Sequence, residues 1–127
     1  MKYFIGAAIL SFFLVSCSDY GKKLSYGKSE LFYTKNVTKE DATKLGDYLK
    51  EQRFFIDDEK TISIQLDKLK DTFLFRMVVL DSALNDKNFI ANANAFPADL
   101  SEHVFDKKPV VFHLCDNRFN VEKVIRP

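Results

Sequence analysis

A predominantly apolar run at residues 4–15 decides how much of this chain is available for folding. The run has 12 residues and follows a single basic residue, Lys2. A membrane-spanning helix needs about 20 apolar residues, so this run is too short to remain as an anchor in its own right. A short apolar core behind a basic N-terminus is typical of a signal peptide. We therefore expect residues 1–16 to be a removed signal peptide.

The end of this run carries a second signal. Leu14-Val15-Ser16-Cys17 resembles the lipobox of bacterial lipoproteins, in which aliphatic and small residues precede a cysteine. The resemblance implies cleavage before Cys17, a lipid on its sulfur and a protein anchored to a membrane of the bacterial cell envelope, facing the periplasm or the cell surface. Two or three acyl chains suffice for stable anchoring. The alternative is an ordinary secretory signal with a cysteine nearby by chance.

Composition limits the class of the exported part. The chain has 19 basic and 18 acidic residues, 46% hydrophobic residues and 14% aromatic residues. Such a balance is typical of a globular domain and not of a disordered chain. Nucleic-acid binding proteins usually carry a basic field, which this chain lacks. We therefore expect no nucleic-acid partner.

The mature sequence predicts a tether followed by one domain. Residues 17–29 hold the lipidated cysteine and a polar stretch with Gly21 and Gly27, without sustained periodicity, which is typical of a flexible linker. Residues 30–127 are expected to form a single α+β domain, whose length is ordinary for one domain.

Two helices are expected within that domain. Thr38 and the acidic residues after it predict the start of a helix that ends near Gln52, and Gly46 inside it indicates close packing. A second helical stripe covers residues 85–105. Pro97 interrupts this stripe, so we expect a kink or break just before it.

Alternating or β-prone runs predict five strands, at residues 31–34, 61–66, 72–80, 110–115 and 121–125. The element order is then β-α-β-β-α-β-β. A duplicated split βαβ unit of this kind predicts a ferredoxin-like plait, an antiparallel sheet with both helices on one face.

Residues 31–125 also resemble a small uncharacterised domain family of exported bacterial proteins. The resemblance implies one exported domain and carries no activity, and Pro97 departs from the uninterrupted second helix of that family. It depends on the following residues: Leu31-Phe32-Tyr33-Thr34, Thr38, Ala42, Leu45-Gly46, Tyr48-Leu49, Gln65-Leu66-Asp67, Phe75-Arg76, Val78-Val79, Leu100-Ser101, Val104-Phe105, Pro109-Val110 and His113-Leu114-Cys115-Asp116.

The sheet face without helices is the candidate binding surface. Strand alternation puts alternate side chains on the same face, and a mixed apolar and polar patch suits a protein partner. The alternative to a binding surface is an ordinary sheet face that is partly exposed to solvent. The candidate residues on this face are Tyr33, Ser63, Gln65, Arg76 and His113.

His113 and Cys115 are the most chemically suggestive pair, because residues two apart on a strand point the same way. They are weak candidates for metal ligands or a thiol dyad, since zinc needs three or four ligands and a free cysteine is usually buried. Phosphate-binding loops and hydrolase motifs are not found in the sequence. The sequence therefore predicts a non-enzymatic module without a cofactor, which binds an envelope protein or itself. A metal- or thiol-dependent protein centred on His113 and Cys115 is the alternative.

Overall fold

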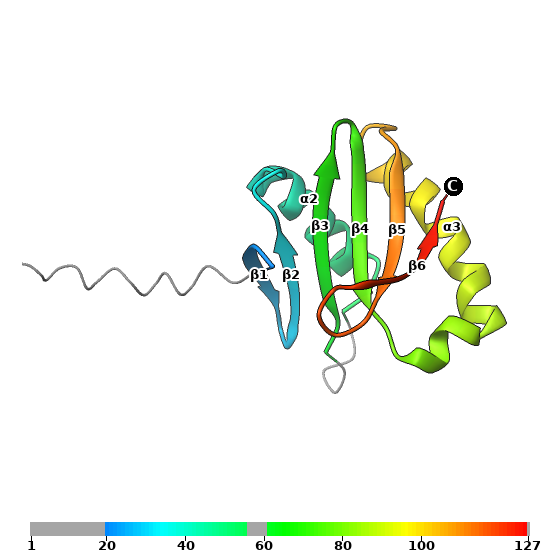
Figure 1. Ribbon diagram of the computed structural model, residues 1–127. Coiled ribbons are helices and arrows are strands. Elements are labelled where there is room, and N and C mark those ends of the chain that lie inside the picture. Colours follow the sequence, from blue (N-terminus) through cyan, green and yellow to red (C-terminus); the bar gives the residue numbers. More distant parts are fainter. Residues whose placement is uncertain (1–19, 56–60, 127) are drawn as a thin grey trace, which may run out of the picture.

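A six-stranded sheet with two helices on one of its faces forms the body of the computed structural model (Figure 1). The structure describes residues 20–55 and 61–126. The predicted signal peptide and Cys17 lie outside the described residues. Within those two ranges, no helix is long and apolar enough to cross a membrane.

Six strands, two α-helices and one 3₁₀ helix lie within the described residues. In chain order they are β1 (Lys22–Tyr26), β2 (Ser29–Tyr33), α2 (Lys39–Glu51), β3 (Ser63–Leu69), β4 (Thr72–Val78), the 3₁₀ helix η1 (Asp81–Asn85), α3 (Lys87–His103), β5 (Val110–Cys115) and β6 (Val121–Ile125).

The strands lie in the sheet in the same order as in the chain, from β1 to β6. β1–β2, β3–β4 and β5–β6 are antiparallel hairpins, whereas β2–β3 and β4–β5 are parallel pairs joined through α2 and α3. The α+β class is therefore confirmed. The ferredoxin-like plait is not confirmed. The sheet has six strands, and each crossover joins adjacent strands, so the sheet is mixed and not wholly antiparallel.

The two crossovers have opposite hands. β2 and β4 run in opposite directions, while both crossovers step the same way along the sheet and both helices lie on the same face. The β4–α3–β5 crossover has the usual right hand, and β2–α2–β3 is left-handed (Figure 1). Two right-handed crossovers in this strand order would cover both faces. The arrangement leaves the second face without a helix.

A single core lies between the sheet and the two helices. Phe75 of β4 and Phe112 of β5 both contact Phe96 of α3, and Phe96 also stacks on Phe54, which follows α2. The Tyr48 hydroxyl of α2 donates to Asp99 of α3 at 2.9 Å and ties the two helices together. The helices therefore pack against each other as well as against the sheet.

Local sequence signals explain the first helix. The Thr38 hydroxyl accepts a hydrogen bond from the backbone N–H of Asp41 at 3.0 Å, which confirms the predicted N-cap. A Cβ on Gly46 would overlap the ring of Tyr26 on β1, so the close packing expected at this glycine is also confirmed. The helix approaches the edge hairpin because this position has no side chain.

The second helix differs from its prediction. α3 runs from Lys87 to His103 without a break, and Pro97 is buried within it. Its N-terminus is capped by Asp86, whose carboxylate accepts from the backbone N–H groups of Asn88 and Phe89. Of the kink or break expected before Pro97, the break is therefore not found.

The predicted tether is shorter than expected. Residues 22–29, assigned to a flexible linker, form β1 and the start of β2. Lys22 pairs with Tyr33 and Leu24 with Leu31, so β1 extends the sheet by one edge strand. Tyr20, just before β1, also packs against the sheet, since its ring contacts Phe32.

Candidate functional site

The face without helices is divided into a covered part and an uncovered part. The loop between β5 and β6 crosses this face (Figure 1), and Phe119 within it packs edge-on against Tyr20 and Phe32. The rings of Tyr20 and Phe119 cover Phe32 of β2, which is only 9% exposed. The uncovered part lies over β4 and β5, toward the β3–β4 turn.

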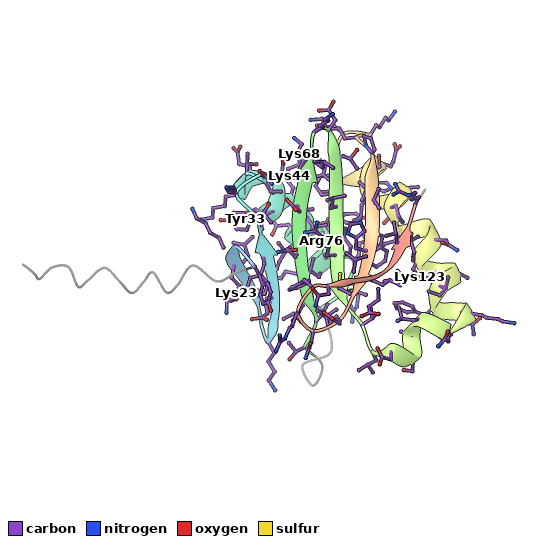
Figure 2. All side chains as sticks on the ribbon, in the orientation of Figure 1. Lys23, Tyr33, Lys44, Lys68, Arg76 and Lys123 are labelled. Carbon is purple, nitrogen blue, oxygen red and sulfur yellow. The ribbon has the colours of Figure 1, made fainter. Side chains whose placement is uncertain are left out.

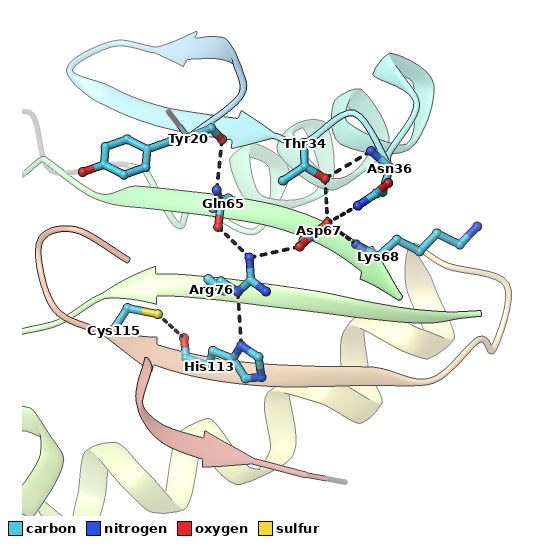
Figure 3. A network of polar contacts seen from close by, with 9 residues as sticks. All are labelled: Tyr20, Thr34, Asn36, Gln65, Asp67, Lys68, Arg76, His113 and Cys115. Carbon is cyan, nitrogen blue, oxygen red and sulfur yellow. Dashed lines mark hydrogen bonds and ion pairs between the residues drawn. The ribbon is translucent and has the colours of Figure 1, made fainter. Parts of the chain in front are cut away.

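A row of polar side chains crosses the sheet beside this aromatic cluster. Gln65, Arg76 and His113 occupy directly opposed positions on β3, β4 and β5 (Figure 3). Arg76 Nη1 donates to Gln65 Oε1 at 2.7 Å, and Arg76 Nε donates to His113 Nδ1 at 3.2 Å. Gln65 Nε2 in turn donates to the carbonyl oxygen of Tyr20 at 3.0 Å. Arg76 therefore holds three strands together near the centre of the face (Figure 2).

Asp67 balances the charge of Arg76. Its Oδ2 lies 3.2 Å from Arg76 Nη1, and both side chains are more than four-fifths buried. Its Oδ1 accepts from the Thr34 hydroxyl at 2.6 Å, from the amide of Asn36 and from the Lys68 backbone N–H. Burial alone would raise the pKa of Asp67, but these hydrogen bonds and Arg76 outweigh it and hold the pKa below 3.8. Asp67 is therefore ionised, and it neutralises Arg76.

His113 is neutral in this arrangement. Its pKa is lowered from 6.5 by burial first, and then by the positive charges of Arg76 and Arg126, while Asp67 partly opposes them. Because Nδ1 accepts the Arg76 hydrogen bond, the ring proton must lie on Nε2. His113 thus offers one N–H donor on the side of the ring away from Arg76 (Figure 3).

A groove of about 450 Å³ lies over the uncovered part of the face. Its lining includes His113 and two cationic residues, Lys70 in the β3–β4 turn and Arg126 after β6, both of which are exposed. None of its lining residues is acidic. The remaining lining residues are Leu69, Thr72, Leu74 and Val111. The groove therefore combines an apolar floor with cations and one imidazole N–H.

Cys115 shares the face of His113 but is not available for chemistry. It is fully buried, and its thiol lies 3.6 Å from the carbonyl oxygen of His113. Burial raises the pKa of Cys115 to about 11, so the thiol stays protonated at neutral pH. In the described part of the chain, no three His, Cys, Asp or Glu side chains are grouped so that they could hold a metal ion.

The candidate residues fall into three groups. Tyr33 is not on the expected face, because it lies on the helix-facing side in the core and is 8% exposed. Ser63 is on the expected face, but it lies away from the groove and donates to Glu30 Oε2 at 3.3 Å. Gln65 and Arg76 are internal members of the polar row. His113 lies both in that row and in the groove.

Several site residues were not predicted. Asp67 lies beyond the strand expected at residues 61–66, although Ser63, Gln65 and Asp67 continue one alternation that could have identified it. Lys70 and Arg126 reach the groove from a turn and from the end of a strand, and no local pattern marks them. Their juxtaposition depends on the pairing of β4, β5 and β6.

Comparison with known protein families finds a match that covers most of the chain. Residues 23–126 match the AF_1994_N family, described as a family N-terminal domain. The match includes β1 within the domain. No curated protein and no solved structure is significantly similar to the chain.

Proposed function

This chain belongs to the AF_1994_N family, and we propose that it is a lipid-anchored binding domain of the bacterial cell envelope without enzymatic activity, whose groove beside His113 holds a segment of a protein partner. The groove is the observation that carries the proposal. A concave surface with an apolar floor and a few polar groups is typical of a binding site. Here it occupies the one sheet face that the helices leave open.

The state of the nearby reactive groups favours binding over catalysis. The Cys115 thiol is buried and protonated, Asp67 is neutralised by Arg76, and His113 uses one ring nitrogen as an acceptor. A thiol nucleophile needs an accessible thiolate beside a base, and this arrangement supplies neither. The alternative centred on His113 and Cys115 is therefore the weaker of the two.

The short span before the fold bears on the proposed anchor. Cys17 and Tyr20 are three residues apart, a distance of at most about 10 Å along an extended chain. A lipid on Cys17 would hold the domain against the membrane surface, and its partner would have to lie there too. Replacing Cys17 with Ala should move the protein out of the membrane fraction and abolish metabolic labelling by a radioactive acyl chain. Unchanged fractionation and labelling would contradict the anchor.

Site-specific photocrosslinking in intact cells tests the binding surface. Leu69 lines the groove and Leu80 lies outside it, and their exposed fractions are similar at 66% and 78%. A photoreactive amino acid at Leu69 should give a discrete crosslinked species, and the same amino acid at Leu80 should not. Replacing Lys70 with Glu in the Leu69 variant should abolish that species.

The crosslinking outcomes separate the possibilities. A Leu69 adduct with the mass of two copies of this chain would support the proposal and identify the partner as a second copy. No adduct at Leu69, or adducts of equal yield at both positions, would contradict the groove as the binding surface.

A further inference from the structure

We infer that the groove beside His113 recognises a carboxylate next to an aliphatic side chain, so that the partner presents an acidic peptide segment there. This inference rests on the proposed function, since it names the chemistry of the ligand for the same groove. Three independent features of the lining support it: its net charge, its hydrogen-bond donor and its apolar floor.

The charge of the groove differs from that of the whole chain. The chain carries a formal net charge of only +1. Around the groove, Asp67 compensates Arg76 at 3.2 Å, which leaves the charges of Lys70 and Arg126 without an acidic residue in the lining. A concave surface with one sign of charge attracts ligands of the opposite sign. The ligand is therefore expected to be an anion.

The donor geometry indicates a carboxylate. His113 presents an Nε2–H, because Arg76 occupies its Nδ1. Arg126 and His113 both line the groove, so a guanidinium and a ring N–H border the same cavity. A carboxylate has two oxygens that accept such donors at once. The Arg76 hydrogen bond fixes the His113 ring before any ligand arrives, which lowers the entropic cost of binding.

The apolar floor indicates what lies beside the carboxylate. Leu74 and Val111 are paired neighbours on β4 and β5, and Leu69 closes the groove at the turn with 66% of its surface exposed. An aliphatic side chain placed over these residues would remove apolar surface from water at about 25 cal/mol per Å². Leucine followed by an acidic residue is the simplest peptide with both properties.

Histidine NMR tests this inference on the full lipidated chain in detergent micelles. The chain has two histidines, and His103 on α3 is an internal control far from the groove. The probes are the dipeptide acetyl-Leu-Glu-amide and its neutral counterpart acetyl-Leu-Gln-amide. The acidic probe should shift the His113 ring signals saturably and leave His103 unchanged, with an affinity at least about tenfold higher than that of the neutral probe.

The His113 titration gives a second readout. The charged groups that face its ring are Arg76 from β4, Asp67 from β3 and Arg126 after β6. A bound carboxylate adds a negative charge beside the ring, so the acidic probe should raise the pKa of His113, while the neutral probe should not. Replacing both Lys70 and Arg126 with Gln should weaken the acidic probe by about tenfold, whereas Lys44→Gln on α2 should have no effect.

The outcomes distinguish this inference from the proposed function. If both dipeptides bind equally, the carboxylate is wrong, but the groove remains a binding site. If neither dipeptide shifts His113 while photocrosslinking at Leu69 succeeds, the ligand class is wrong and the proposed function stands. If both the dipeptides and the photocrosslinking fail, both are overturned.

Discussion

Arg76 and His113 lie opposite each other on the neighbouring parallel strands β4 and β5, and the guanidinium Nε–H donates to the imidazole Nδ1 at 3.2 Å. Only neutral histidine has a nitrogen that can accept this bond. Protonation would remove the acceptor and place a second cation beside Arg76. The fold is therefore more stable when His113 is uncharged.

The first prediction concerns the pH dependence of stability. The pKa of His113 is lowered in the fold by burial and by Arg76 and Arg126, whereas the unfolded chain titrates near 6.5. The contribution of His113 is therefore full above pH 6.5, and it is lost as the pH falls from 6.5 through the folded-state pKa. Urea denaturation on both sides of this window should show the loss. The His113→Gln variant should not show it, and an unchanged slope in that variant would contradict the argument.

Asp67 makes the stability of the fold depend on pH in a second, more acidic range. Its folded-state pKa lies below 3.8, so its stabilising effect is present above pH 3.8 and is lost as the pH falls through the lower, folded-state value. Asp67→Asn should reduce the loss of stability in this acidic pH range. At neutral pH it should also lower the free energy of unfolding by about 1–3 kcal/mol, because Arg76 loses its ionic partner. Asp71→Asn in the neighbouring turn is the control, and equal effects in the two variants would refute a special role for Asp67.

The thiol of Cys115 should be inert in the folded protein. It is fully buried, and its pKa is raised to about 11 by burial. Alkylation by iodoacetamide at neutral pH should therefore be slow in the native protein and fast in concentrated denaturant. Mass spectrometry of the labelled chain measures both rates. Rapid labelling of the native protein would restore the thiol-dependent alternative.

Gly46→Ala should destabilise the fold, although alanine is the better helix former by about 1 kcal/mol. The added methyl group would overlap the Tyr26 ring, which cannot move freely because it stacks on Phe55 at 4.9 Å. We expect a loss of about 1–3 kcal/mol in thermal or urea unfolding. In a Tyr26→Ala background the same substitution should be neutral or stabilising. Equal losses in both backgrounds would show that the Tyr26 contact is not the cause.

The elements with strong local signals were predictable from the sequence. The Thr38 cap and the apolar spacing after it predict α2 within one residue of its observed end. β5 and β6 match their predicted bounds, because both have β-prone residues between clear turns. β1 gave no such signal, since its short run KKLSY is mostly exposed and depends on pairing with β2.

The face of Tyr33 could not be determined from its neighbours. Leu31, Phe32 and Tyr33 are all buried, so no polar residue indicates which face of β2 is the solvent-exposed one. Phe32 is buried on the second face only because Tyr20 and Phe119 arrive from opposite ends of the chain. The strand order has a similar cause. In a plait the third strand would lie between the first and the second, whereas tertiary packing here places each crossover between neighbours.

The sequential strand order has a consequence for how this chain acquires its structure. Every pair of neighbouring strands in the sheet is also a pair of neighbours along the sequence. The three hairpins close short loops, whereas the parallel pairs β2–β3 and β4–β5 close longer loops that contain α2 and α3. Domains dominated by contacts between nearby residues fold faster than domains that must first close long loops. We therefore expect the three hairpins to form first and the two βαβ crossovers to join them into one sheet afterwards.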